Sequence, residues 1–319
     1  MLSRSFCGHF LLVTRHYPHF GALFGIGLGD YTEKTFHLET VYGVCHESKT
    51  KRLENASING YLRTVKYLVT QGADIHAHAE GALISTSKEG HLEVVKYLVT
   101  QGADVHALDD CALRLASWKG HLDVVKYLVS QEGADIHAQY DYALRWASGK
   151  GHLDVVKYLV TQGADVHADY DDALRLASRE GYLDVVACLV LVGADIHADD
   201  DKALRWASGE GHLEVIKYLI EMGADVHAGG DYALVWASKE GYLDVVKYLV
   251  SQGANIHAND DCALRWTSKG GHLDVVEYLV SQGANIHAND DDALRLASGE
   301  GHLDVVKYLV SQGANIHAN

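Results

Sequence analysis

The last nineteen residues, GHLDVVKYLVSQGANIHAN at 301–319, repeat residues 271–289 with one change, Lys307 for Glu277. The same pattern recurs along the chain every 30 residues, with one interval of 31 where Glu132 is inserted. The glycine of its GA[DN][IV]HA segment stands at 72, 102, 133, 163, 193, 223, 253, 283 and 313. A unit this short cannot bury a core alone, so we expect an array in which each unit packs against its neighbours.

Each unit has two glycine turns and two segments with helical patterning. The first segment, ALR[LW]AS, follows an aspartate such as Asp110, which we expect to cap the helix by accepting from its free amides. It ends at a glycine such as Gly120, which can adopt the left-handed conformation. The second segment, LDVVKYLVSQ, has an acidic first turn, and its apolar residues recur at helical spacing, as in Leu122, Val125, Leu128 and Val129. We therefore predict an all-α fold.

The motif GHLDVVKYLVSQGANIHA resembles the second helix and following turn of an ankyrin repeat, over about residues 43–319. The resemblance implies an ankyrin-type helical solenoid of about nine helix-turn-helix units. The first unit, 43–71, is degenerate but keeps Leu53 and Gly60. The resemblance also implies a non-catalytic scaffold that binds a protein partner, without a cofactor.

Two features depart from the family pattern. The Thr-Pro-Leu-His opening of the first helix is replaced by X-Ala-Leu-Arg, and the repeat is three residues shorter than the usual 33. Because the missing residues fall between HA and AL, we expect short hairpin turns. Short ALR-type repeats with KYLV helices are similar to ankyrin proteins that giant viruses of amoebae encode, which implies a viral origin.

Charge and cysteine content narrow the function further. The net charge is −16, and the acidic excess lies in the repeats, which argues against binding nucleic acid. Five cysteines without close spacing indicate reduced thiols and a cytoplasmic location, in the host cytoplasm if the protein is viral. No apolar run reaches the ~18–20 residues of a membrane helix, so we expect no membrane partner.

Repeated histidines, serines and aspartates could suggest a metal site or a hydrolase. Equivalent residues of adjacent repeats lie about one helix-packing distance apart, ~8–10 Å, whereas zinc needs nitrogens at ~2.0–2.1 Å. A catalytic triad needs one constellation with an oxyanion hole, and this chain has many interchangeable copies. We therefore assign the histidines to turns and hydrogen bonds between repeats, and predict neither a metal site nor catalysis.

An arginine recurs at one position of the first helix, with Ile84 and Val235 breaking the series. Two interpretations are open: each arginine pairs with aspartates of its own or the next turn, or the row offers bidentate donors to an acidic partner. The acidic surroundings favour the first. The members are Arg114, Arg145, Arg175, Arg205, Arg265 and Arg295.

Positions that vary between repeats are free to carry recognition, because the fold does not require them to stay the same. Aromatic residues interrupt turns that are elsewhere mostly Asp, Asn or Gly, and Trp118 stands where other repeats have Lys, Gly or Arg. One second helix reads YLDVVACLVLV instead of HLDVVKYLVSQ. Exposed aromatic and apolar residues of this kind mark interfaces. The protein-binding candidates are Trp118, Tyr140, Tyr142, Tyr170, Ala187, Leu191, Val192 and Met222.

Some of these differences between repeats also have a structural explanation. The apolar helix at 182–192 can equally reflect drift among duplicated repeats. Four tryptophans share a first-helix position that is Leu in other repeats, so we expect them in the core. They are Trp146, Trp206, Trp236 and Trp266.

The two ends of the chain lie outside the regular pattern. Residues 1–42 contain all five phenylalanines and no motif that we can assign, so they are either a cap or an adaptor that recruits a ubiquitin ligase or similar host machinery. The last full unit ends at 312, followed by a partial turn at 313–319. Because a terminal repeat normally needs a polar outer face, we expect the last one to fray or to self-associate.

Overall fold

The computed structural model describes residues 48–317, and within them the chain forms 18 helices and no strands. The helices alternate between a first and a second helix of each repeat, which confirms the predicted all-α solenoid of about nine units. The first helices are α3 (Lys49–Ile58), α5 (Ala77–Lys88), α7 (Ala107–Lys119), α9 (Ala138–Gly149), α11 (Ala168–Glu180), α13 (Ala198–Gly209), α15 (Ala228–Glu240), α17 (Ala258–Gly270) and α19 (Ala288–Glu300). The second helices are α4 (Leu62–Thr70), α6 (Leu92–Thr100), α8 (Leu122–Glu132), α10 (Leu153–Thr161), α12 (Leu183–Leu191), α14 (Leu213–Glu221), α16 (Leu243–Ser251), α18 (Leu273–Ser281) and α20 (Leu303–Ser311).

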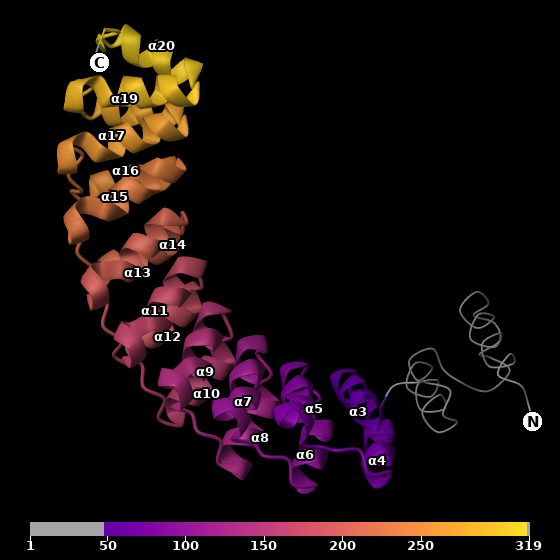
Figure 1. The fold of residues 1–319 in the computed structure, drawn as a ribbon. Coiled ribbons are helices and arrows are strands. Elements are labelled where there is room, and N and C mark those ends of the chain that lie inside the picture. The colour runs from indigo at the N-terminus through magenta and orange to yellow at the C-terminus, as the bar shows by residue number, and fades with distance from the viewer. Residues whose placement is uncertain (1–47, 318–319) are drawn as a thin grey trace, which may run out of the picture. The chain divides into compact units, whose positions relative to one another are not determined.

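The chain divides into two compact units, Met1–Asp135 and Ile136–Asn319, and the boundary comes three residues after the inserted Glu132. Within each unit the first helices pack side by side in one row, and each second helix packs on the first helix of its own repeat (Figure 1). In residues 48–317 no helix is long and apolar enough to cross a bilayer. The predicted boundary at residue 42 lies outside the described residues.

The core is built from small layers that repeat with the sequence. In α8 the fully buried residues are Val124, Val125 and Leu128, whereas Leu122 and Val129 are partly exposed. The buried face is thus shifted from the one that simple spacing indicated, because a second helix contacts neighbouring second helices as well as its own first helix. Each first helix adds small residues, such as Ala112 and Ala116, which let the packed helices approach closely.

The first helices from α5 onward begin with a left-handed turn. In α7, Leu108, Asp109 and Asp110 have φ of 53 to 55°, and the right-handed helix continues from Cys111. This conformation is unfavourable for most L residues but is tolerated by Asp and Asn. The tip of each repeat is therefore only these three residues long, which explains the frequency of Asp and Asn there and confirms the expected short turns.

The aspartate before ALR does not cap its own helix, which corrects the prediction for Asp110. Its Oδ1 accepts the backbone N–H of Asp135 at 3.0 Å and lies 3.0 Å from Nδ1 of His106. The carboxylate is buried, so it links one repeat to the next through the amide of the following turn. Six later repeats make the same link through Asp141, Asp171, Asp201, Asp231, Asp261 and Asp291.

The histidine after the second glycine also joins repeats. The Nε2 atom of His91 donates to the carbonyl oxygen of Ile58 at 2.9 Å, and Nε2 of His302 donates to the carbonyl oxygen of Lys269 at 2.8 Å. The preceding glycine of the neighbouring repeat makes room for the ring: Gly90 has φ of 80°, and a Cβ there would lie 2.4 Å from Nδ1 of His121. These contacts confirm the prediction that histidines serve as hydrogen-bonding groups between repeats.

Candidate protein-binding surface

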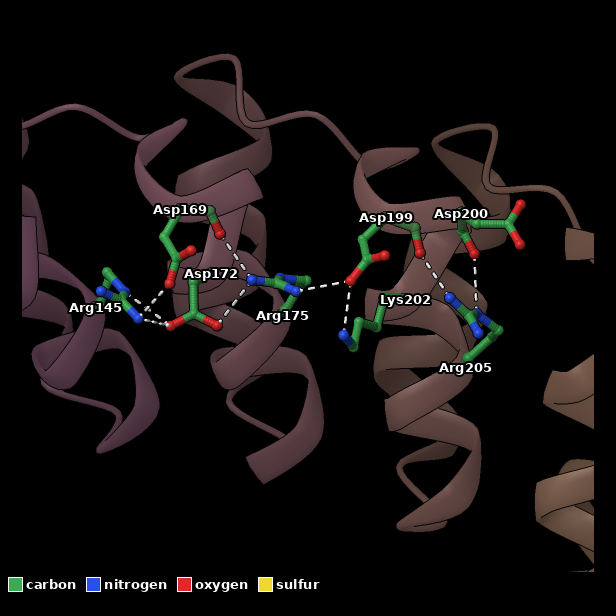
Figure 2. A network of polar contacts seen from close by, with 8 residues as sticks. All are labelled: Arg145, Asp169, Asp172, Arg175, Asp199, Asp200, Lys202 and Arg205. Carbon is green, nitrogen blue, oxygen red and sulfur yellow. Dashed lines mark hydrogen bonds and ion pairs between the residues drawn. The ribbon is translucent and has the colours of Figure 1, made fainter. Parts of the chain in front are cut away.

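The arginine row forms a network with the tips in the second unit (Figure 2). Arg145 of α9 reaches the next repeat, where its Nη2 lies 2.6 Å from Asp169 and 2.7 Å from Asp172. Asp172 also accepts from Arg175 at 3.1 Å, and Arg175 continues the row to Asp199 at 3.0 Å. The predicted pairing of arginines with aspartates of their own or the next turn is confirmed here.

Other members of the row bind main-chain carbonyls of their own tip. Arg205 donates to the carbonyl oxygens of Asp199 and Asp200 at 2.6 and 2.9 Å, and Arg114 binds its own tip in the same way. Asp199 is held by Lys202, and that hydrogen bond lowers the pKa of its carboxyl group. Since these guanidinium groups hold the tips in place, they do not form a free row for an acidic partner.

The histidines of the turns are engaged as well. His76 lies 2.6 Å from Glu80, and this hydrogen bond raises the pKa of the imidazole. Among residues 48–317 no group of three or more His, Cys, Asp or Glu side chains is placed to hold a metal ion. In these residues the histidine row therefore links turns and presents no chelating cluster.

Two tip tyrosines lie on the surface of the second unit. Tyr140 is 77% exposed and Tyr170 is 75% exposed, and they occupy the same position in adjacent repeats. Both have left-handed backbone, with φ of 59 and 57°. Because a tyrosine in this conformation is less favourable than Asp or Asn, nothing in the fold accounts for its presence.

Two other predicted aromatic residues are engaged in local packing. Tyr142 is half-buried, its ring lies 4.4 Å from that of Trp146, and the Arg145 guanidinium lies 5.2 Å from the Tyr142 ring centre. Trp118, in the first unit, is also half-buried, with the Lys119 ammonium 4.5 Å from its ring centre. Their exposed area is therefore smaller than that of the tip tyrosines.

The unusual second helix, α12, presents apolar residues to solvent at its C-terminal end. Leu191 is 81% exposed, Val192 is also exposed, and Met222 is exposed at the end of the neighbouring α14. Ala187, by contrast, is half-buried. Helices α12 and α14 are in contact, so Leu191 and Val192 lie on the same edge of the array as Met222.

The four tryptophans predicted to be in the core are not buried. Trp146, Trp206 and Trp236 are half-exposed, and Trp266 is 36% exposed. Their position in the first helix faces away from the buried layer, and Leu176 at the same position is half-exposed too. The prediction was wrong because Leu at a position does not distinguish a buried face from a partly covered one.

A hollow of about 350 Å³ opens between two of these tryptophans, at the C-terminal ends of α11, α13 and α15. Its lining includes Arg179, Trp206, Glu210, Trp236, Lys239 and Glu240. Gly209 also lines it, and a Cβ at this glycine would be 3.1 Å from the Trp236 ring. Sequence reasoning missed this site, although one signal was present: Gly209 interrupts the basic residues Arg179 and Lys239 of the flanking repeats.

The family model for ankyrin repeats, in its three-copy form, matches residues 53–140, 137–200, 174–260 and 234–319. The chain belongs to the ankyrin repeat family. No curated protein matches the sequence significantly, so no partner is carried over from a relative.

Ankyrin repeats are generally modules of protein–protein interaction and typically lack catalytic activity. This ankyrin array holds many of its charged side chains in contacts within and between repeats, as the Arg145 network and the Asp110 link illustrate. Its variable, exposed side chains are therefore the natural place to look for a binding surface.

Proposed function

We propose that the chain is a non-catalytic scaffold that binds a protein partner through the tips bearing Tyr140 and Tyr170. The observation that carries the proposal is the exposure of two tyrosines at equivalent positions of adjacent repeats. Tyrosine supplies a large, rigid contact area and is enriched at interface hot spots. Two such rings on neighbouring tips offer a partner two contact points of the same kind.

The backbone at these tyrosines supports the same proposal. A non-glycine residue in the left-handed region costs roughly 1–2 kcal/mol, and Asp or Asn reduces that cost. The equivalent residues of other repeats include Asp200, Gly230 and Asp260, so favourable residues are available to this array. Backbone strain retained at an exposed aromatic residue is typical of functional positions.

The apolar edge formed by Leu191, Val192 and Met222 belongs to the proposal as a second contact region. These side chains replace polar residues of other repeats and lie on adjacent second helices. Burying them against a partner would remove apolar surface from water, at roughly 25 cal/mol per Å². Trp118, Tyr142 and Ala187 remain proposed contributors with less accessible surface.

The test is partner capture with the full chain and a double variant, Tyr140→Ala with Tyr170→Ala. We expect most of the capture to be lost while the denaturation midpoint stays unchanged or rises. The matched control is Asp260→Ala with Asp290→Ala, which changes the same position in another adjacent pair of repeats. Equal loss of capture in the control would remove the special role of the two tyrosines.

An adaptor role is the second candidate, with residues 1–42 recruiting a ubiquitin ligase or similar machinery. It is supported by the unusual composition of that segment, which holds every phenylalanine of the chain and lies outside the described residues. Comparing the proteins captured by the full chain with those captured by residues 43–319 separates the two roles. An origin in a giant virus, with action in the host cytoplasm, belongs to this candidate and is supported by the short ALR-type repeats.

Self-association through the last repeat is a further part of the proposal. Leu303 is 60% exposed and Val310 is also exposed, whereas their equivalents in α18, Leu273 and Val280, are half-buried. A second copy of the chain would cover these side chains. Sedimentation velocity over a range of concentrations tests this: a dimer that Leu303→Lys abolishes supports it, and a monomer at every concentration contradicts it.

A further inference from the structure

Trp236 differs from its neighbours in having an open ring face. Trp206 has Arg179 5.3 Å and Lys202 5.0 Å from its ring centre, and Trp266 has Lys269 at 5.1 Å. Over the described residues, no cation lies on the Trp236 ring, whose aromatic contact is Tyr232 at 6.4 Å. One cause is in the same helix, where Tyr232 stands at the position that Lys202 occupies in the repeat of Trp206.

The space in front of this ring exists because a side chain is missing. The position before each helix-ending Glu is Arg179 in one repeat and Lys239 two repeats later, but Gly209 in between. The glycine lets Trp236 lie close to the end of α13 and leaves the gap between Arg179 and Lys239 unfilled. At 350 Å³ the hollow is at the small end of ligand sites, which run from about 300 to 1,000 Å³, so one side chain fits it better than a helix.

The charges around the hollow leave one carboxylate available. Arg179 is paired with Glu180 at 2.7 Å, and Lys239 is paired with Glu240 at 2.8 Å. Glu210 is exposed at the edge of the hollow and forms no ion pair with any described residue. The array as a whole is strongly acidic, with a net charge of −16 for the chain. Both the local and the overall charge therefore favour a cationic ligand over an anionic one.

We propose that this hollow binds the arginine side chain of a basic segment in the protein partner. The guanidinium stacks on Trp236, which lacks a cation of its own, and donates hydrogen bonds to Glu210. Arginine suits the site because its planar group stacks on aromatic rings and pairs with a carboxylate at the same time. The inference rests on the proposed protein-binding function and adds to it the chemistry of one subsite and the sign of the partner's charge.

The test measures binding of a fluorescein-labelled peptide, Gly-Ser-Arg-Gly-Ser, to the full chain by fluorescence anisotropy. The comparison peptide carries Glu in place of Arg. We expect the arginine peptide to bind and the glutamate peptide to bind at least about tenfold more weakly, since a cation–π contact and a charged hydrogen bond each contribute on the order of tenfold. Tighter binding of the glutamate peptide would overturn the proposal.

Matched variants separate this site from diffuse attraction to an acidic protein. Glu210→Gln is compared with Glu300→Gln, which removes the same charge from the same repeat position outside the hollow. Trp236→Leu is compared with Trp266→Leu, because leucine already occupies this position in other repeats. We expect about a tenfold loss for Glu210→Gln and for Trp236→Leu, and less than about twofold for their controls. Equal losses within each pair would overturn the proposal.

Filling the gap offers a third comparison, in which the tryptophan itself is not substituted. Gly209→Lys restores the basic side chain that other repeats have, and Gly299→Lys adds the same side chain where nothing lies within 4 Å of a Cβ. We expect peptide binding to be lost in the first and kept in the second. Peptide binding could be absent, or unchanged by every variant of the hollow, while the Tyr140 and Tyr170 variants still abolish partner capture. In that case the arginine site is wrong and the scaffold function stands.

Discussion

The tips of the repeats and the buried layer beneath them follow opposite rules. In the buried layer, Leu144, Leu174 and Leu204 occupy one position in consecutive repeats, and each is fully buried. At the tips, Tyr140 and Tyr170 are exposed, while the same position in the next repeat is Asp200. A buried position keeps its residue because a change of volume is felt by all packed neighbours. An exposed tip is restricted mainly by its left-handed backbone, so its side chain is available for recognition.

The contrast also shows how the repeats are joined. The buried leucines join neighbouring repeats through apolar packing, which does not depend on the direction of approach. Asp172 joins them through ion pairs with Arg145 and Arg175, which need defined distances. The network ends where Arg205 turns back to its own tip, because Tyr232 stands where Asp172 stands two repeats earlier. The arginine links therefore vary along the array, and the apolar layer does not.

The largest effect should come from placing a charge in the buried layer. Leu219 in α14 is fully buried, so Leu219→Asp should lower the free energy of unfolding by about 3–5 kcal/mol through an unpaired buried charge. Leu191→Asp is the matched change at an exposed site in α12 and should shift it by less than about 0.5 kcal/mol. Urea denaturation followed by circular dichroism measures both. Similar midpoints for the two variants would show that Leu219 is not part of a buried layer.

An intermediate effect is expected where a polar link crosses between repeats. Arg145→Ala removes ion pairs to the next repeat and leaves the mostly buried Asp172 with one partner fewer, which should cost about 1–3 kcal/mol. Arg205→Ala removes bonds to its own tip only and should cost about 1 kcal/mol or less. A double-mutant cycle with Asp172→Asn measures the coupling. Coupling for Arg205 as large as for Arg145 would show that the network does not act locally.

A smaller effect of opposite sign is expected at the tips. Tyr170→Asn replaces a bulky residue at φ of 57° by one that tolerates the left-handed region, and should raise the free energy of unfolding by about 0.5–1 kcal/mol. Asp200→Asn, at the same position, should change the free energy of unfolding by only about a few tenths of a kcal/mol. The denaturation midpoint measures both. A clear loss of stability in Tyr170→Asn would show that the tyrosine serves the fold.

The smallest effect concerns pH. Because the hydrogen bond with Glu80 raises the pKa of His76, the folded state favours the protonated ring. The stabilisation is fully present below the ordinary pKa of 6.5 and is lost as pH rises through the raised value. The midpoint difference between the wild type and His76→Gln should therefore shrink from about pH 6 to pH 8. In a Glu80→Gln background the difference should change much less with pH, because the charges of Asp74 and Asp104 raise the pKa of His76 less than Glu80 does. A difference that grows with pH in the wild-type background would contradict this pairing.

Much of the fold could be read from spacing. The 30-residue period, the glycines and the apolar residues of the second helix predicted about nine pairs of helices, and the arginine contacts followed from the aspartates of their own or the next turn. The candidates in the tips were identified by comparing repeats within the chain. The tryptophans and the hollow at Gly209 could not be found this way, because periodicity states which residues share a face but not how much of that face is covered.

Sequence alone determined what depends on local chemistry: the helix-forming segments, the left-handed glycines that end them, and an acidic array whose single units are too small to fold alone. Tertiary structure decided what depends on the neighbouring repeat. Asp110 gives its carboxylate to the amide of Asp135 instead of capping its own helix, since the next turn lies within hydrogen-bonding distance. Trp236 faces an open space, since the residue that would fill it is a glycine of the preceding repeat. The stacking of repeats brings such residues against their neighbours. How far each side chain is buried therefore depends on both repeats being in place.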